Sequence, residues 1–135
     1  MEALMKRNLV MILGLCMGLL LAAVPLLAHH ALAAEFDSSK PVKFTGTVKS
    51  VDWMNPHIYV NIEAKDETGK NVVYSVEGGP PNSLYRNGWR KDSLKPGDVV
   101  QVSGMKAKKA DSNRIGNARI VTADGKAVFR NGPEQ

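Results

Sequence analysis

Hydrophobic and polar residues follow two different patterns along the chain. Residues 9–27 are almost uniformly apolar, whereas the chain from residue 42 onward contains short runs in which apolar and polar positions alternate. The clearest alternation covers residues 57–63, where Ile58, Val60 and Ile62 share one face of an extended strand. The pattern predicts an apolar leader followed by a domain of β-strands, with His57 on the outward, polar face.

Turn sequences divide the chain after residue 42 into β-type runs. Asn-Pro, Gly-Gly-Pro-Pro and Pro-Gly-Asp separate them, and a loop is expected over residues 106–117. Gly46 interrupts the first run and predicts a bulge or a sharp bend. A short helix is expected over residues 82–86, with Trp89 packing it onto the strands. The expected strands cover residues 42–53, 57–63, 72–77, 99–105, 118–122 and 127–129.

Three strands, a short helix and two or three further strands follow the order of an OB-fold, a five-stranded Greek-key barrel. We therefore expect an all-β domain with one short helix, a small OB-fold-like Greek-key β-barrel of five to six strands. A six-stranded barrel or an open sandwich is the alternative. The expected organisation is a leader over residues 1–28, an extended arm over 29–41, the barrel over 42–130 and a polar tail over 131–135.

The leader has the features of a secretory signal peptide. Lys6 and Arg7 precede the apolar stretch, and Ala28 closes it. The stretch approaches the roughly 20 residues of a membrane span, so a retained anchor is the alternative. Cleavage after Ala33 fits the small-residue rule better than cleavage after Ala28 but makes the leader unusually long, so residue patterns alone leave the two cut sites nearly balanced. Removal of the leader predicts a periplasmic or secreted protein with no stable membrane insertion.

Charge and cysteine content narrow the function classes. The only cysteine, Cys16, lies in the leader, so the exported domain has no disulfide or thiolate site. Loss of Lys6, Arg7 and Glu2 with the leader lowers the net charge from +5 to +4. This excess is dispersed, and an exported protein meets little nucleic acid, so we expect no nucleic-acid partner.

Three histidines suggest a metal site. Cleavage after Ala28 would place His29 at the amino terminus, where its amine and ring chelate a divalent ion and His30 adds a second ring. His57 would complete an all-nitrogen set that favours copper, and Met54 would supply a soft axial ligand. The alternative is that the paired histidines only start the mature chain and His57 bonds to Asn55 or to a backbone carbonyl.

Binding without a metal is the second hypothesis. OB-folds bind oligonucleotides and oligosaccharides on the face of their second and third strands. We predict no enzyme: no serine occupies a nucleophile-elbow pattern, and His57, even if Asp52 or Glu63 orients it, has no evident nucleophile. A hydrolase is therefore the weakest alternative. The candidate ligand-binding residues are Trp53, Tyr59, Asn61, Ser75, Glu77, Arg86 and Arg90.

Several short motifs together resemble a family of small exported bacterial proteins that carry a domain of unknown function. They are His29-His30 followed by Glu35-Phe36-Asp37, Gly46-Thr47-Val48, Trp53-Met54-Asn55-Pro56-His57, Gly88-Trp89, residues 92–98 and Asn117-Ala118-Arg119. The resemblance implies a mature start near the paired histidines, which favours cleavage after Ala28, and implies no activity. We expect an exported, non-enzymatic binding or accessory domain of the bacterial envelope, with copper as the hypothesised cofactor or an envelope protein or glycan as the partner.

Overall fold

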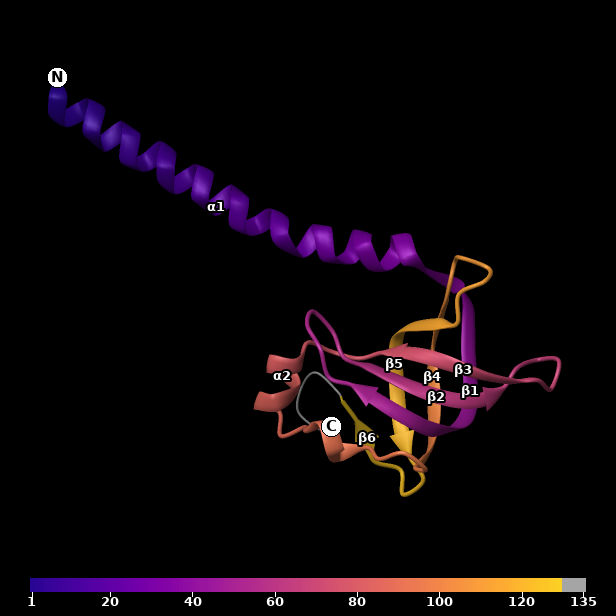
Figure 1. Cartoon of the computed structure of the whole chain (residues 1–135). Helices are drawn as coiled ribbons and strands as arrows, with labels where there is room; N and C mark the ends of the chain where they lie inside the picture. Colours follow the sequence, from indigo (N-terminus) through magenta and orange to yellow (C-terminus); the bar gives the residue numbers. More distant parts are fainter. Residues whose placement is uncertain (130–135) are drawn as a thin grey trace. The chain divides into compact units, whose positions relative to one another are not determined.

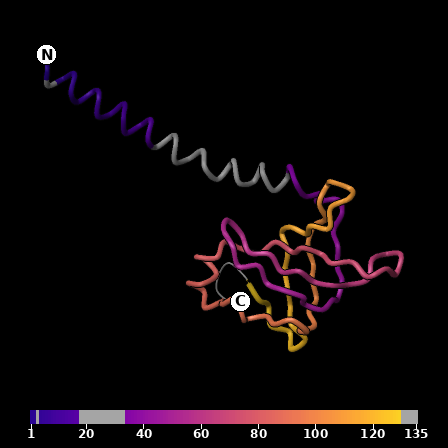
Figure 2. Tube along the Cα trace, in the orientation of Figure 1, coloured from indigo at the N-terminus to yellow at the C-terminus, as the bar shows by residue number. Residues whose placement is uncertain are grey.

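The computed structural model describes residues 1–129, except the side chains of Ala3 and of residues 18–33. Figure 2 draws the residues that are not fully described in grey. The chain forms two compact units, Met1–Ala34 and Glu35–Gln135. Helix α1 (Glu2–Glu35) accounts for the first unit. Within the fully described residues, no helix is long and apolar enough to cross a membrane.

The second unit is a ring of β-strands, shown in Figure 1. Its sheet has the order β3-β2-β1-β4-β5-β6, and a parallel pairing of β3 with β5 closes the ring. A short helix, α2, lies between β3 and β4 in the chain. This order confirms the expected OB-fold-like, all-β domain with one short helix. The bounds are β1 (Phe36–Asp52), β2 (Tyr59–Lys65), β3 (Asn71–Glu77), α2 (Pro81–Arg86), the 3-10 helix η1 (Lys91–Ser93), β4 (Val99–Ala107), β5 (Arg114–Thr122) and β6 (Ala127–Val128).

The core follows the alternation of the sequence. Ile58, Val60 and Ile62 are fully buried, as the apolar face around β2 predicts. Leu84 of α2 and Leu94 after η1 are also buried in this cluster, so the segment between β3 and β4 covers part of the core. Trp89 packs against the same cluster with its ring 5.9 Å from that of Phe129, which confirms its expected packing role.

Two strands begin earlier than the sequence pattern predicts. Of the arm expected to be extended over residues 29–41, residues 36–41 are extended as the start of β1, whereas residues 29–35 belong to α1. Phe36 is buried against the bare backbone of Gly116, where an added Cβ would lie 2.4 Å from its ring. Strand β5 starts at Arg114 inside the expected loop, because pairing with β3 and burial of Ile115 hold it.

Gly46 allows a close crossing of two strands. A Cβ at this position would lie 2.6 Å from the backbone oxygen of Glu63 and from the Ile62 side chain. The irregularity in pairing lies instead between Val48 and Ser50. Before Thr47, β1 pairs with β4 alone, and from Thr47 onward it pairs with β2. Strand β1 therefore separates from β2 on the N-terminal side of Gly46.

Candidate polar binding face

The outward side chains of four strands form one polar surface. Cross-strand pairing places Tyr59 opposite Glu77 and Asn61 opposite Ser75, so these four residues share a face as predicted. Pairing of β2 with β1 adds Ser50 and Asp52 at one edge of this group, and pairing of β3 with β5 adds Arg114 at the other. We call the set the polar face: Ser50, Asp52, Tyr59, Asn61, Ser75, Glu77 and Arg114.

Asn61 joins β2 to β1 on the polar face. Its side-chain amide donates to the Ser50 hydroxyl at 2.9 Å and to the Asp52 carboxylate at 2.8 Å. Both bonds are partly buried, which strengthens them relative to bonds in open water. Because both donors of this amide are engaged, its carbonyl oxygen points away from them as an acceptor.

Arg114 organises the other edge of the polar face. Its guanidinium donates to the Tyr59 hydroxyl at 2.9 Å and to the Glu77 carboxylate at 3.1 Å, and it also forms an ion pair with Glu35. The guanidinium carbon lies 5.2 Å from the centre of the Tyr59 ring. A planar group with several fixed donors suits such multiple pairing, so Arg114 fixes the orientation of both partners.

His57 extends this network by one contact. Its Nδ1 lies 2.5 Å from the Glu77 carboxylate, whose side chain is only 14% exposed. Glu77 thus bridges His57 and Arg114 with its two oxygens. The sequence suggested Asp52, Glu63 or Asn55 as the partner of His57, and that suggestion was wrong because β3 places Glu77 opposite the start of β2. The second ring nitrogen of His57 forms no hydrogen bond among the described residues.

The polar face is acidic although the whole chain is basic. Its charged groups are Asp52, Glu77 and Arg114, and Glu35 adds a third carboxylate at its edge. These three carboxylates outnumber Arg114 and His57, so the surface has an excess of negative charge. Such a surface disfavours polyanions, including nucleic acid, and suits neutral or cationic groups.

A shallow cavity of about 820 Å³ borders the polar face. Ser50 and Asp52 form one wall, and Arg90 with the η1 residues Lys91 and Asp92 forms the other. Leu94 lies among the apolar lining residues. The hydrogen-bonded groups around Asn61 therefore adjoin a hollow rather than a flat sheet.

Three of the predicted ligand-binding residues are not part of the polar face. Trp53 packs against the core with its ring 6.0 Å from that of Phe129. Arg90 lies 3.8 Å over the Tyr85 ring and donates to the Tyr85 and Trp89 carbonyl oxygens, although it also lines the shallow cavity. Arg86 is exposed in the last turn of α2. Trp53 and Arg86 are not brought into the polar face.

The proposed metal ligands are described only in part. The side chains of His29 and His30 lie outside the described residues. Met54 is half exposed and precedes the Asn55-Pro56 turn, and the His57 side chain is 40% exposed. Among the described residues, no group of three or more His, Cys, Asp or Glu side chains is arranged to hold a metal ion. The copper hypothesis thus depends on His29 and His30.

Sequence reasoning missed Arg114 as a site residue. It lay in the expected loop over residues 106–117, where a basic residue is usually solvated. The one available signal was Ile115-Gly116 beside it, an apolar residue followed by a glycine. Ser50 and Glu35 were missed because their roles depend on the β1–β2 register and on the contact with β5.

Comparison with known proteins gives a family and no function. A family model described as a family of unknown function (DUF6152) matches residues 17–117, which include every residue of the polar face. No curated protein and no solved structure matches the chain.

Proposed function

The chain belongs to this family of unknown function, and we propose that it is an exported, non-enzymatic binding domain of the bacterial envelope. Its ligand-binding surface is the polar face, and its ligand is a neutral glycan segment. The observation that carries the proposal is the orientation of Tyr59, Asn61 and Ser75 on one face by hydrogen bonds and strand register. Their hydroxyl and amide groups match the hydrogen-bonding groups of a sugar.

The side chains of the polar face are held in place before any ligand binds, which supports the proposed binding. Asn61 is held by two acceptors, and Arg114 holds the hydroxyl of Tyr59. A ligand that meets groups already fixed in one geometry loses less conformational entropy on binding. The Tyr59 ring adds an apolar surface for a sugar face, and the shallow cavity beside Asp52 gives room for a second unit.

The contacts of His57 support binding rather than catalysis. A hydrolytic base needs a nucleophile within hydrogen-bond reach as well as a carboxylate that orients it. Glu77 supplies the carboxylate. Among the described residues, no serine or threonine hydroxyl bonds to His57, so its observed role is to join the network of Glu77 and Arg114.

Nuclear magnetic resonance tests the proposal with a defined probe. We would titrate the ¹⁵N-labelled protein, as the cell exports it, with the tetramer of N-acetylglucosamine, a neutral glycan. Shift changes should centre on Ser50, Asn61 and Ser75. The absence of changes, or changes confined to other strands, would contradict the proposal.

A pair of matched variants locates the binding surface. Ser75→Arg places a bulky side chain on the polar face and should lower the affinity at least roughly tenfold, because it blocks the contact region. Thr45→Arg makes the same change at an exposed position on β1, where the strand pairs with β4. It should leave the affinity unchanged. Equal effects of both variants would show that charge, not location, determines binding.

Copper binding is the second candidate, and one contact favours it. When one ring N–H of a histidine donates a hydrogen bond to a carboxylate, the other ring nitrogen is oriented as a metal ligand. Glu77 provides that carboxylate for His57. We propose copper(II) as the ion, with His29, His30 and Met54 as the further ligands.

Two measurements test the copper candidate. Intact mass of the exported protein would establish whether His29 is its first residue; a start at Ala34 removes two of the proposed ligands. Copper titration followed by electron paramagnetic resonance should then show nitrogen ligation that His57→Ala weakens. If the protein binds copper no more tightly than a short peptide beginning His-His, the barrel contributes nothing and the candidate fails.

A further inference from the structure

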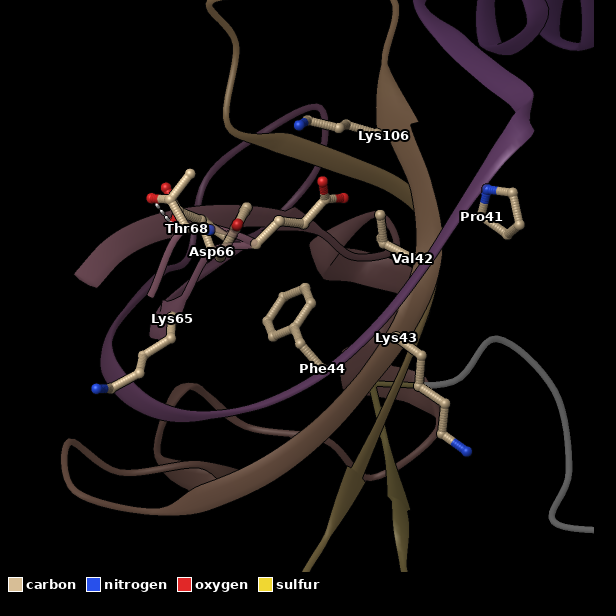
Figure 3. Close-up of a pocket in the computed structure, with 10 residues that line it drawn as sticks. Pro41, Val42, Lys43, Phe44, Lys65, Asp66, Thr68 and Lys106 are labelled. Atoms are coloured by element: carbon tan, nitrogen blue, oxygen red, sulfur yellow. Dashed lines mark hydrogen bonds between the residues drawn. The ribbon is translucent and has the colours of Figure 1, made fainter. Parts of the chain in front are cut away.

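A second cavity lies where β1 separates from the end of the β2–β3 hairpin (Figure 3). It has a volume of about 450 Å³, within the range of roughly 300–1,000 Å³ that small-molecule sites occupy. None of its lining residues belongs to the polar face. We call it the β1 pocket, and it is lined by residues 41–44 of β1, residues 65–68 at the end of the hairpin, Tyr74 and Lys106.

The floor of the β1 pocket is aromatic. The rings of Phe44 and Tyr74 lie 4.7 Å apart at 32°, and both pack against the buried core. Phe44 lies at the centre of the view in Figure 3, with Val42 beside it. The two rings stack on each other, so a ring-shaped ligand would meet the outer side of this stack.

The rim of the β1 pocket carries ammonium groups without carboxylate partners. Lys43, Lys65 and Lys106 form no ion pair among the described residues, whereas Lys40 and Lys49 each have one. Lys106 is half-buried and lies along the upper rim of the pocket in Figure 3, while the ends of Lys43 and Lys65 point outward. Lys106 is therefore the cation at the rim that is best placed to meet a bound ligand.

One of the two carboxylates at the rim is already engaged. Asp66 accepts hydrogen bonds from the backbone and hydroxyl of Thr68 and from the backbone of Lys70. These bonds, led by the Thr68 hydroxyl, lower the pKa of Asp66. Glu67 is the other carboxylate, so the three ammonium groups outnumber the carboxylates. The rim therefore has an excess of positive charge.

Tyr74 adds a neutral donor to the pocket. Burial, followed by the charges of Asp66 and Glu67, raises the pKa of its hydroxyl. The hydroxyl therefore keeps its proton at neutral pH, and it makes no hydrogen bond among the described residues. A protonated hydroxyl can donate a hydrogen bond to an oxygen of a ligand.

We propose that the β1 pocket binds a small aromatic anion, whose ring packs against the stacked rings of Phe44 and Tyr74 and whose anionic group bonds to Lys106. The site is separate from the polar face, so the proposal does not depend on glycan or copper binding. Its features are an aromatic lining and a cation without a carboxylate partner, which together select both shape and charge.

Naphthalene-2-sulfonate and naphthalene-2-sulfonamide form a matched pair of probes. They share size and ring, but only the sulfonate is charged. Titration of the ¹⁵N-labelled protein with the sulfonate should shift the signals of Val42, Phe44 and Lys106. The sulfonamide should bind at least about tenfold more weakly, since it lacks the charge-assisted bond. Equal binding of the two probes, or no shifts around the pocket with the sulfonate, would overturn the proposal.

Two variants separate the pocket from general attraction to a basic protein. Lys106→Gln should weaken sulfonate binding roughly five- to tenfold, because it removes the cation that meets the sulfonate at the rim. Lys49→Gln makes the same change in net charge outside the pocket and should have no effect. If both variants bind the sulfonate equally, Lys106 has no special role and the proposal fails.

A third variant fills the cavity. Val42→Phe adds a ring to the lining at a half-buried position. With an unchanged circular dichroism spectrum, it should abolish the sulfonate-induced shifts. Retained binding in the folded variant would overturn the proposed location. If Val42→Phe fails to fold, Tyr74→Phe replaces it, and an unchanged sulfonate affinity in that variant would also contradict the site.

Discussion

The polar face and the β1 pocket handle charge in opposite ways. On the polar face, Arg114 and Glu77 are paired with each other and with Glu35, Tyr59 or His57. In the β1 pocket, Lys106 has no carboxylate partner among the described residues. Paired groups hold a surface in one geometry, whereas an unpaired cation beside an aromatic floor leaves a charge for a ligand to meet. One domain thus carries a surface of paired charges and a pocket with an unpaired cation.

The largest expected effect comes from the strand crossing that separates the two regions. Gly46→Ala would place a Cβ against the backbone of Glu63, which is rigid, so the strands must move apart. We expect a loss of about 2–3 kcal/mol in the free energy of unfolding. Urea denaturation measures this loss, and the exposed neighbour Thr45→Ala should cost less than about 1 kcal/mol. A Gly46→Ala protein as stable as the wild type would disprove the close crossing.

Loss of Glu77 tests the pairing on the polar face. Glu77→Gln keeps the shape but removes the charge that Arg114 and His57 share. Because the side chain is mostly buried, we expect a loss of about 1–2 kcal/mol in the free energy of unfolding. High salt should reduce this loss of unfolding free energy only slightly, because buried ion pairs are screened little. No change in urea denaturation would show that the network does not stabilise the fold.

Loss of Lys106 should have almost no effect on stability. Lys106→Gln removes a cation that makes no ion pair, so the free energy of unfolding should change by less than about 0.5 kcal/mol. The same variant should still lose affinity for naphthalene-2-sulfonate. This combination separates a residue that binds from one that stabilises. A destabilisation as large as that of Glu77→Gln would remove the contrast between the two regions.

The smallest effect concerns acid sensitivity at the hairpin. The folded-state pKa of Asp66 lies below its ordinary value of 3.8, chiefly because of the Thr68 hydroxyl. Its stabilising contribution is therefore complete above the ordinary pKa and is lost as the pH falls through the lower folded-state value. Thr68→Val should reduce this part of the acid-induced loss of stability. Urea denaturation between pH 5 and pH 2 measures it, with Ser39→Ala as a control that acts on Asp37 instead.

The sequence predicted what depends on local pattern. The alternation of apolar and polar residues identified the buried face of β2. It also placed Tyr59, Asn61, Ser75 and Glu77 on one outward face, as their pairing shows. The partner of His57 and the role of Arg114 depend on pairings between strands far apart in the chain, which no local pattern encodes. The β1 pocket was not predicted either, because it results from the separation of β1 and β2 at Gly46.

A double titration tests the central claim that the barrel binds through a fixed polar face. The ¹⁵N-labelled protein is titrated with the N-acetylglucosamine tetramer, first alone and then with naphthalene-2-sulfonate present. We predict glycan shifts at Ser50, Asn61 and Ser75 that the sulfonate neither removes nor displaces, while the sulfonate shifts Phe44 and Lys106. Glycan shifts that are absent from the polar face, or that coincide with those of the sulfonate, would contradict the claim.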